Sequence, residues 1–192
     1  MDFGKSLKEN GFSDALKFSN QQREQDIAAI MAFYPAGEVK RVERSELWLD
    51  KCGIDYSAHL ADGEKETYDA KWRRKGAKKY WKSGRPEVAI ELCSDVERHK
   101  LGWVYTAECD YFLFCFEDVA DRFRIVAQLL KLAVRRFLRK WEKEFGVQKQ
   151  KSYEGGRIWF STCIFVPVDE LKACCQAVAF GRKIGDDDND YQ

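Results

Sequence analysis

The chain has 192 residues, a formal net charge of +1 and 45% hydrophobic residues, which suits one packed domain and excludes a globally basic protein. No apolar run approaches the roughly 18 residues of a membrane span, and the first residues lack a signal-peptide core. The 7 cysteines lie among apolar residues with no Cys-x-x-Cys pair, and the only histidines are His59 and His99. This composition argues against structural zinc and predicts reduced thiols in a cytoplasmic protein without a membrane partner.

Taken in chain order, the hydrophobic patterns predict a helix, five strands, a long helix, one strand and a last helix. The first helix is predicted at 20–34, the strands at 38–49, 52–60, 64–73, 86–93 and 110–116, a further short strand at 122–126, the long helix at 127–145, the last strand at 157–166 and the last helix at 168–179. We expect a single α/β domain over residues 1–184 and an acidic, disordered tail over residues 185–192.

The second and third predicted strands form a β-hairpin. Residues 52–60 and 64–73 alternate between apolar and polar side chains, which is typical of half-buried strands. The loop Ala61–Gly63 has glycine at the last position of a three-residue turn, where a left-handed conformation is needed. This turn pairs Leu60 with Glu64 and thereby sets the register of the whole hairpin.

In this register Asp55 lies opposite Asp69 on one polar face, with Lys71 on the same face, while Ile54 faces Ala70 on the apolar side. Opposed carboxylates repel, so a sequence that keeps them together indicates a cation between them. Two aspartates form a hard oxygen site of the kind that Mg²⁺ or Mn²⁺ prefers. The alternative is a solvated strand face with an ordinary Asp–Lys pair.

The pattern resembles the PD-(D/E)XK, or restriction-endonuclease-like, nuclease superfamily, in particular its small phage or mobile-element members. In that family an Asp near one strand and an acidic-x-Lys on the next strand hold a divalent metal and the attacking water. The resemblance implies that Asp55 and Asp69 bind the metal and that both act in catalysis with Lys71. The proline of the family name is absent, since Ile54 stands before Asp55. The implied fold is α/β with an αβββαβ core, in which a central mixed sheet carries the site on a hairpin and helices flank it.

Other acidic residues are candidates near this site. Glu91 interrupts the apolar strand at 86–93, and a buried Glu is rare unless it is paired. It is either a third catalytic, metal-binding carboxylate or the partner of an arginine, and both interpretations remain open. Glu24 and Asp26 on the first helix could also reach the site, although surface solvation is the favoured interpretation of both.

A basic segment follows Lys71. Residues 71–85 contain eight lysines or arginines and no acid, with Trp72, Tyr80 and Trp81 between them. Such a segment is suited to neutralising phosphates, and an exposed Tyr80 or Trp81 would stack on an unpaired base. The alternative is a merely solvated loop. The candidate nucleic-acid-binding residues are Arg73, Arg74, Lys75, Lys78, Lys79, Trp81 and Lys82.

Together these features predict a Mg²⁺- or Mn²⁺-dependent DNA endonuclease that hydrolyses phosphodiester bonds. One alternative is a non-catalytic nucleic-acid- or protein-binding factor on the same fold, such as a phage or mobile-element protein that acts on a host component. Another is a nuclease directed at RNA. Nucleic acid, DNA in particular, is the expected partner, and a homodimer is left open. Metal binding at Asp55 and Asp69 separates an enzyme from a binding protein.

Overall fold

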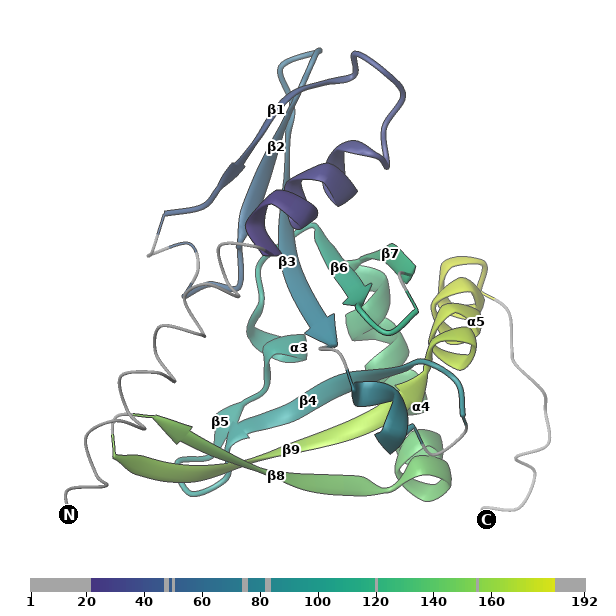
Figure 1. The fold of residues 1–192 in the computed structure, drawn as a ribbon. Coiled ribbons are helices and arrows are strands. Elements are labelled where there is room, and N and C mark those ends of the chain that lie inside the picture. Colours follow the sequence, from purple (N-terminus) through teal and green to yellow (C-terminus); the bar gives the residue numbers. More distant parts are fainter. Residues whose placement is uncertain are drawn as a thin grey trace.

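The strands of the protein form two separate sheets (Figure 1). The computed structural model describes residues 22–46, 49, 51–73, 76–81, 84–119, 121–154 and 156–181. The mixed sheet has the strand order β1-β2-β3-β6-β7, and the antiparallel sheet has the order β5-β4-β9-β8. The predicted central mixed sheet with flanking helices is present, but the strands predicted at 86–93 and 157–166 belong to the second sheet.

The mixed sheet carries the hairpin. Its strands are β1 (Val39–Arg44), β2 (Tyr56–Leu60), β3 (Lys65–Arg73), β6 (Tyr111–Phe116) and β7 (Asp121–Val126). β2 is antiparallel to both of its neighbours, β1 and β3. β6 runs parallel to β3, and β7 runs antiparallel to β6. Parallel neighbours need a crossover connection. Here the crossover contains the 3₁₀ helix η1 (Ala77–Tyr80), β4 (Glu87–Asp95), β5 (Lys100–Leu101) and the short helix α3 (Trp103–Thr106).

Helices cover the sheets and enclose two apolar cores. A helix at residues 22–31 lies across one face of the mixed sheet, where its Ala29 and Ile30 pack on buried side chains that include Tyr68 (Figure 1). The larger core lies between the other face, the antiparallel sheet, and helices α4 (Ala127–Phe145) and α5 (Val168–Ala179). Among the described residues, no helix is long and apolar enough to cross a membrane.

The predicted long helix and last helix have the expected bounds, and the predicted strands recur with shifted ends. Four described elements were not predicted: the short elements η1 and β5, strand β8 and helix α3. Strand β8 (Val147–Glu154), which pairs with β9 (Arg157–Pro167), is an edge strand rich in Gln and Lys, so it has no apolar period to recognise. Helix α3 has only four residues, too few for a helical period.

Gly102 holds α3 against β4. A Cβ at this position would lie 2.0 Å from the backbone oxygen of Glu91, and the Gly102 N–H donates to the oxygen of Leu92 at 3.0 Å. We expect Gly102→Ala to lower the free energy of unfolding by about 3 kcal/mol or more. The added methyl group would clash with the backbone of Glu91, which cannot move aside as a flexible side chain can. Chemical denaturation measures this loss. Gly37→Ala adds the same methyl group in open space at a φ of 87°, and should cost only about 1–2 kcal/mol of backbone strain.

Candidate functional site

The hairpin register is the predicted one. Tyr56 pairs with Tyr68 and His59 with Lys65, so the opposed residues are those expected from the turn. The Leu60 N–H donates to the oxygen of Glu64 at 2.9 Å, and Gly63 has a φ of 96°. The glycine thus takes the left-handed position that a three-residue turn needs.

Asp55 lies directly before β2, and its contacts place it beside β3. Its N–H donates to the oxygen of Tyr68 at 2.8 Å, and its Oδ2 accepts the N–H of Ala70 at 2.9 Å. The Asp55 carboxylate thus accepts the hydrogen bond that a backbone oxygen would accept if β2 began earlier in the chain. The predicted pairing of Ile54 with Ala70 is wrong, because the chain leaves the ladder here and Ile54 packs into the larger core.

Asp69 is buried, in contrast to the predicted polar face. Its side chain is 2% exposed. The neighbouring residue on β6 is Phe112, which is fully buried on the same face. Gly53 and Ala107 close over the carboxylate: a Cβ on Gly53 would lie 2.8 Å from the Ala107 Cβ and 3.4 Å from Asp69 Oδ2. The solvated strand face considered above is therefore excluded for Asp69, and its charge needs a specific partner.

Lys71 supplies part of that partnership. Its Nζ lies 2.7 Å from Asp69 Oδ1, with the lysine side chain 28% exposed. Burial raises the pKa of Asp69 to about 7. The ammonium of Lys71 lowers this pKa, whereas the nearby carboxylate of Asp55 raises it further. Asp69 Oδ2 is buried and receives no N–H or hydroxyl donor from the described residues; its polar neighbour is the Asp55 carboxyl, which can share a hydrogen bond with it only when one of the two carries a proton. An oxygen atom in this position, beside a second carboxylate, requires a proton or a cation.

Trp103 connects Lys71 to Glu91. The Nζ of Lys71 lies 5.0 Å from the centroid of the Trp103 ring, which is a cation–π contact. The Trp103 N–H donates to Glu91 Oε2 at 3.3 Å, so Glu91 caps the first turn of α3. Glu91 therefore contacts the site only indirectly, through the residue whose ring packs on Lys71. Trp103 could not be predicted from the sequence, since nothing in its spacing relative to Lys71 indicates that α3 folds back over β3.

The site can offer a metal ion two carboxylates from this chain. Within the described ranges, no group of three or more His, Cys, Asp or Glu side chains is arranged to hold a metal ion, and Glu91 is not placed as a third ligand. Asp55 and Asp69 alone fit a Mg²⁺ ion, which usually keeps several water ligands and binds one or two carboxylates.

Asp26 is buried on the opposite face of the mixed sheet. It accepts hydrogen bonds from Tyr56 Oη at 2.8 Å and Trp72 Nε1 at 2.7 Å. Burial raises its pKa to about 6, although both hydrogen bonds lower it. Asp26 thus anchors the helix at 22–31 to β2 and β3, and the surface solvation considered for it is wrong.

The basic segment is only partly on the surface. Trp81 is 7% exposed and belongs to the larger core, so the predicted stacking of this side chain on a base is wrong. Arg73 is half-buried against the ring of Phe165, at 4.9 Å from its centroid, which does not suit a phosphate contact. Lys78 and Lys79 are exposed as expected. Arg74, Lys75 and Lys82, and the side chain of Tyr80, lie outside the described residues.

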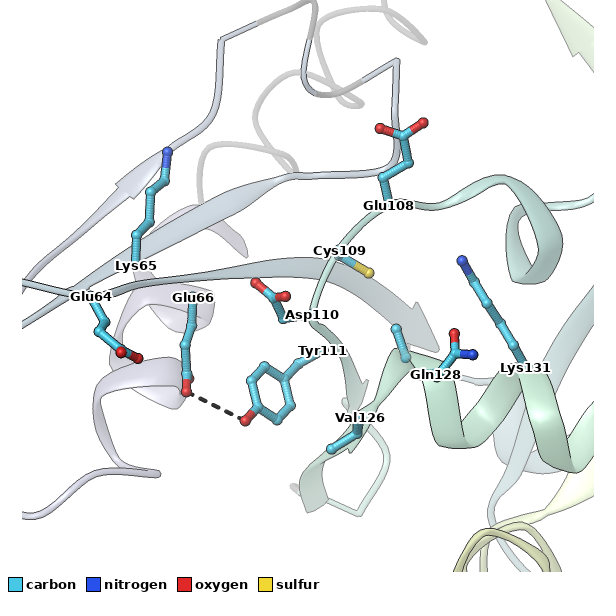
Figure 2. Close-up of a pocket in the computed structure, with 11 residues that line it drawn as sticks. Glu64, Lys65, Glu66, Glu108, Cys109, Asp110, Tyr111, Val126, Gln128 and Lys131 are labelled. Atoms are coloured by element: carbon cyan, nitrogen blue, oxygen red, sulfur yellow. Dashed lines mark hydrogen bonds between the residues drawn. The ribbon is translucent and has the colours of Figure 1, made fainter. Parts of the chain in front are cut away.

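A cavity of about 560 Å³ opens near the site at the amino end of α4 (Figure 2). Figure 2 shows Lys131 extending from α4 toward the segment with Glu108 and Cys109. Carboxylates outnumber cations in its lining, with Glu64, Glu66, Glu108 and Asp110 against Lys65 and Lys131. Such a lining repels phosphate, so this cavity is not the place for a nucleic-acid backbone.

The comparisons with known proteins identify no relative. No protein-family model, curated protein or solved structure matches the chain. The geometry of the site is therefore the basis on which a function is proposed.

Proposed function

We propose that the protein is a Mg²⁺- or Mn²⁺-dependent DNA endonuclease whose metal is held by Asp55 and Asp69. The observation that carries this proposal is the buried Oδ2 of Asp69, which has no hydrogen-bond donor among the described residues and lies near the Asp55 carboxylate. Holding the buried carboxylate of Asp69 beside the half-buried carboxylate of Asp55 costs free energy unless a proton or a cation joins them. A divalent ion would satisfy the oxygen that Lys71 leaves unpaired.

The order of elements supports the same family of nucleases. If η1, β4 and β5 are set aside as insertions between β3 and α3, the helix at 22–31, β1, β2, β3, α3 and β6 have the order α-β-β-β-α-β, which the resemblance to the PD-(D/E)XK superfamily implies. In this proposal Asp55, directly before β2, and Asp69-x-Lys71 on β3 correspond to the Asp and the acidic-x-Lys of the family motif. The antiparallel sheet is an addition to this core within the β3–β6 crossover and after α4.

Each residue has a distinct part in the proposed reaction. A bound Mg²⁺ ion would lower the pKa of a water molecule and stabilise charge at the phosphate. Asp55 is oriented for binding by the Ala70 N–H, and Asp69 by the ammonium of Lys71. Lys71 is partly exposed and would orient the attacking water and offset the charge of the phosphate. The Trp103 ring packs against this ammonium, and Glu91 binds the backbone N–H of Trp103.

One observation favours the non-catalytic alternative, a nucleic-acid- or protein-binding factor on a nuclease-like fold. Asp69 already forms an ion pair with Lys71 at 2.7 Å, and protonation near its pKa of about 7 would satisfy the remaining oxygen without metal. In that case the site is a structural remnant and metal has no effect.

Incubation of the protein with supercoiled, branched and single-stranded DNA, and with a matched RNA, tests the proposal. We expect DNA cleavage with Mg²⁺ or Mn²⁺ and none with EDTA, because a metal held by Asp55 and Asp69 would activate the attacking water. Binding without cleavage in either metal would favour the binding factor. Cleavage of RNA in preference to all of the DNA substrates would mean that the protein is a nuclease directed at RNA.

A further inference from the structure

The outer face of α4 carries a cluster of cations. Residues 127–141 contain Lys131, Arg135, Arg136, Arg139 and Lys140 and no acid. Like charges four residues apart destabilise a helix slightly, so helix stability alone does not favour this spacing. Lys140 is paired with Glu144 and Glu170. Arg135 and Arg139 are exposed, and no acidic side chain of the described residues forms an ion pair with either.

Three of these cations form a stripe that begins at the candidate site. Lys131, Arg135 and Arg139 are four residues apart, so they share one side of the helix. The Nζ of Lys131 donates to the oxygen of Ala107 at 2.5 Å, and Ala107 is the residue that closes over Asp69 with Gly53. Arg135 lies close enough to Tyr105 of α3 to lower the pKa of its hydroxyl, which burial and Glu142 raise.

The stripe on α4 therefore begins beside Ala107 and α3, close to the pair of Lys71 and Trp103, and runs along α4 from there. From Lys131 to Arg139 the helix rises about 12 Å, which spans three to four phosphates at about 3.4 Å per nucleotide along one strand. Arginine is suited to bidentate contacts with phosphate oxygens. Lys131 also borders the acidic cavity of Figure 2, which would keep a nucleic-acid backbone on the α4 side.

We propose that the face of α4 defined by Lys131, Arg135 and Arg139 binds the phosphodiester backbone of the nucleic acid on one side of the cleaved bond. This inference rests on the proposed function for its substrate, but not on cleavage. It assigns contacts with the nucleic-acid phosphates to α4, whereas the sequence predicts these contacts on the basic segment after Lys71.

The test is the binding of a 30-base-pair DNA duplex, measured by fluorescence anisotropy between 25 and 250 mM salt without divalent metal. In Arg135→Gln/Arg139→Gln we expect weaker binding at every salt concentration. The slope of log K against log salt should fall by about 1.8, or about 0.9 for each phosphate that is no longer neutralised. The matched control is Lys40→Gln/Arg41→Gln, which removes the same charge from exposed positions of β1 and should retain the slope of the unmodified protein.

Equal slopes in the arginine double variant and the unmodified protein would overturn the inference, as would an equal fall in the control. Circular dichroism of both variants shows whether α4 remains folded, and Arg135→Lys/Arg139→Lys should restore most of the slope, since the charge is kept. If DNA binds through α4 but is never cleaved, the inference stands and the proposed function fails. Binding to anionic lipid vesicles but not to DNA would overturn both.

Discussion

Asp69→Asn should abolish metal-dependent DNA cleavage and remove a pH-dependent loss of stability. Asparagine has nearly the same shape as aspartate but cannot contribute the charge that holds a divalent ion. The substitution keeps the position beside Phe112 filled, so the core should remain intact. Cleavage of plasmid DNA in Mg²⁺ and in Mn²⁺ measures the loss of activity, which we expect to be complete within detection.

The stability effect has a definite sign. The pKa of Asp69 is raised from 3.8 to about 7 by burial, so between these values the native state keeps a proton that the unfolded state has released. The free energy of unfolding therefore falls as pH rises from about 4 to 7, by on the order of 4 kcal/mol relative to the Asn variant. Urea unfolding in EDTA across this range measures the difference, and the titration of Asp26 cancels because both proteins contain it.

Asp62→Asn is the matched control, since it removes one carboxylate from the exposed turn of the same hairpin. It should cleave DNA as the unmodified protein does. If Asp69→Asn cleaves DNA at the original rate, Asp69 does not bind a catalytic metal. If the two stability curves run parallel from pH 4 to 8, the Asp69 carboxyl does not titrate as a buried group.

Lys71→Ala should lower the rate of cleavage by about 10²- to 10⁴-fold, the range for a group that assists proton transfer. Metal binding should persist, because Lys71 is not a ligand. Loss of the ammonium 2.7 Å away should also raise the pKa of Asp69 further, so the variant should need higher pH to bind metal. Single-turnover cleavage as a function of pH and metal concentration separates the two effects.

Lys65→Ala gives the comparison for Lys71→Ala on the same strand. Lys65 is exposed at the other end of β3, where it pairs with His59. This variant should retain the full rate of cleavage. A Lys71→Ala protein as active as the Lys65 variant would mean that the ion pair with Asp69 is structural only.

The hairpin could be predicted from sequence because local features determine it. The turn Ala61–Gly63 sets the register, and the alternation on both sides assigns residues to faces. Both features lie within about twenty residues of chain, so no distant partner is needed to recognise them. The same reasoning placed Asp55 and Asp69 next to each other, although the ladder ends at Tyr56 and Asp55 joins β3 through its side chain.

The burial of the site could not be predicted in this way. Alternation separates two faces but does not reveal that β6 lies parallel to β3 and brings Phe112 beside Asp69. It also does not show that Gly53 and Ala107 meet above the carboxylate, or that Trp103 reaches Lys71. Similarly, the charge of the basic segment gave no indication that Trp81 fills the core. All of these contacts join residues far apart in sequence.

Binding of Mn²⁺ to the protein in the absence of nucleic acid tests the central claim most directly. Electron paramagnetic resonance of the free ion, recorded as protein is added at pH 8 and at pH 6, counts the bound metal. We predict one Mn²⁺ site that weakens at pH 6, where Asp69 holds its proton, and that is lost in both Asp55→Asn and Asp69→Asn but retained in Asp62→Asn. A protein that binds no Mn²⁺ at millimolar concentration, or whose binding survives in both variants, would contradict a metal centre at these two carboxylates.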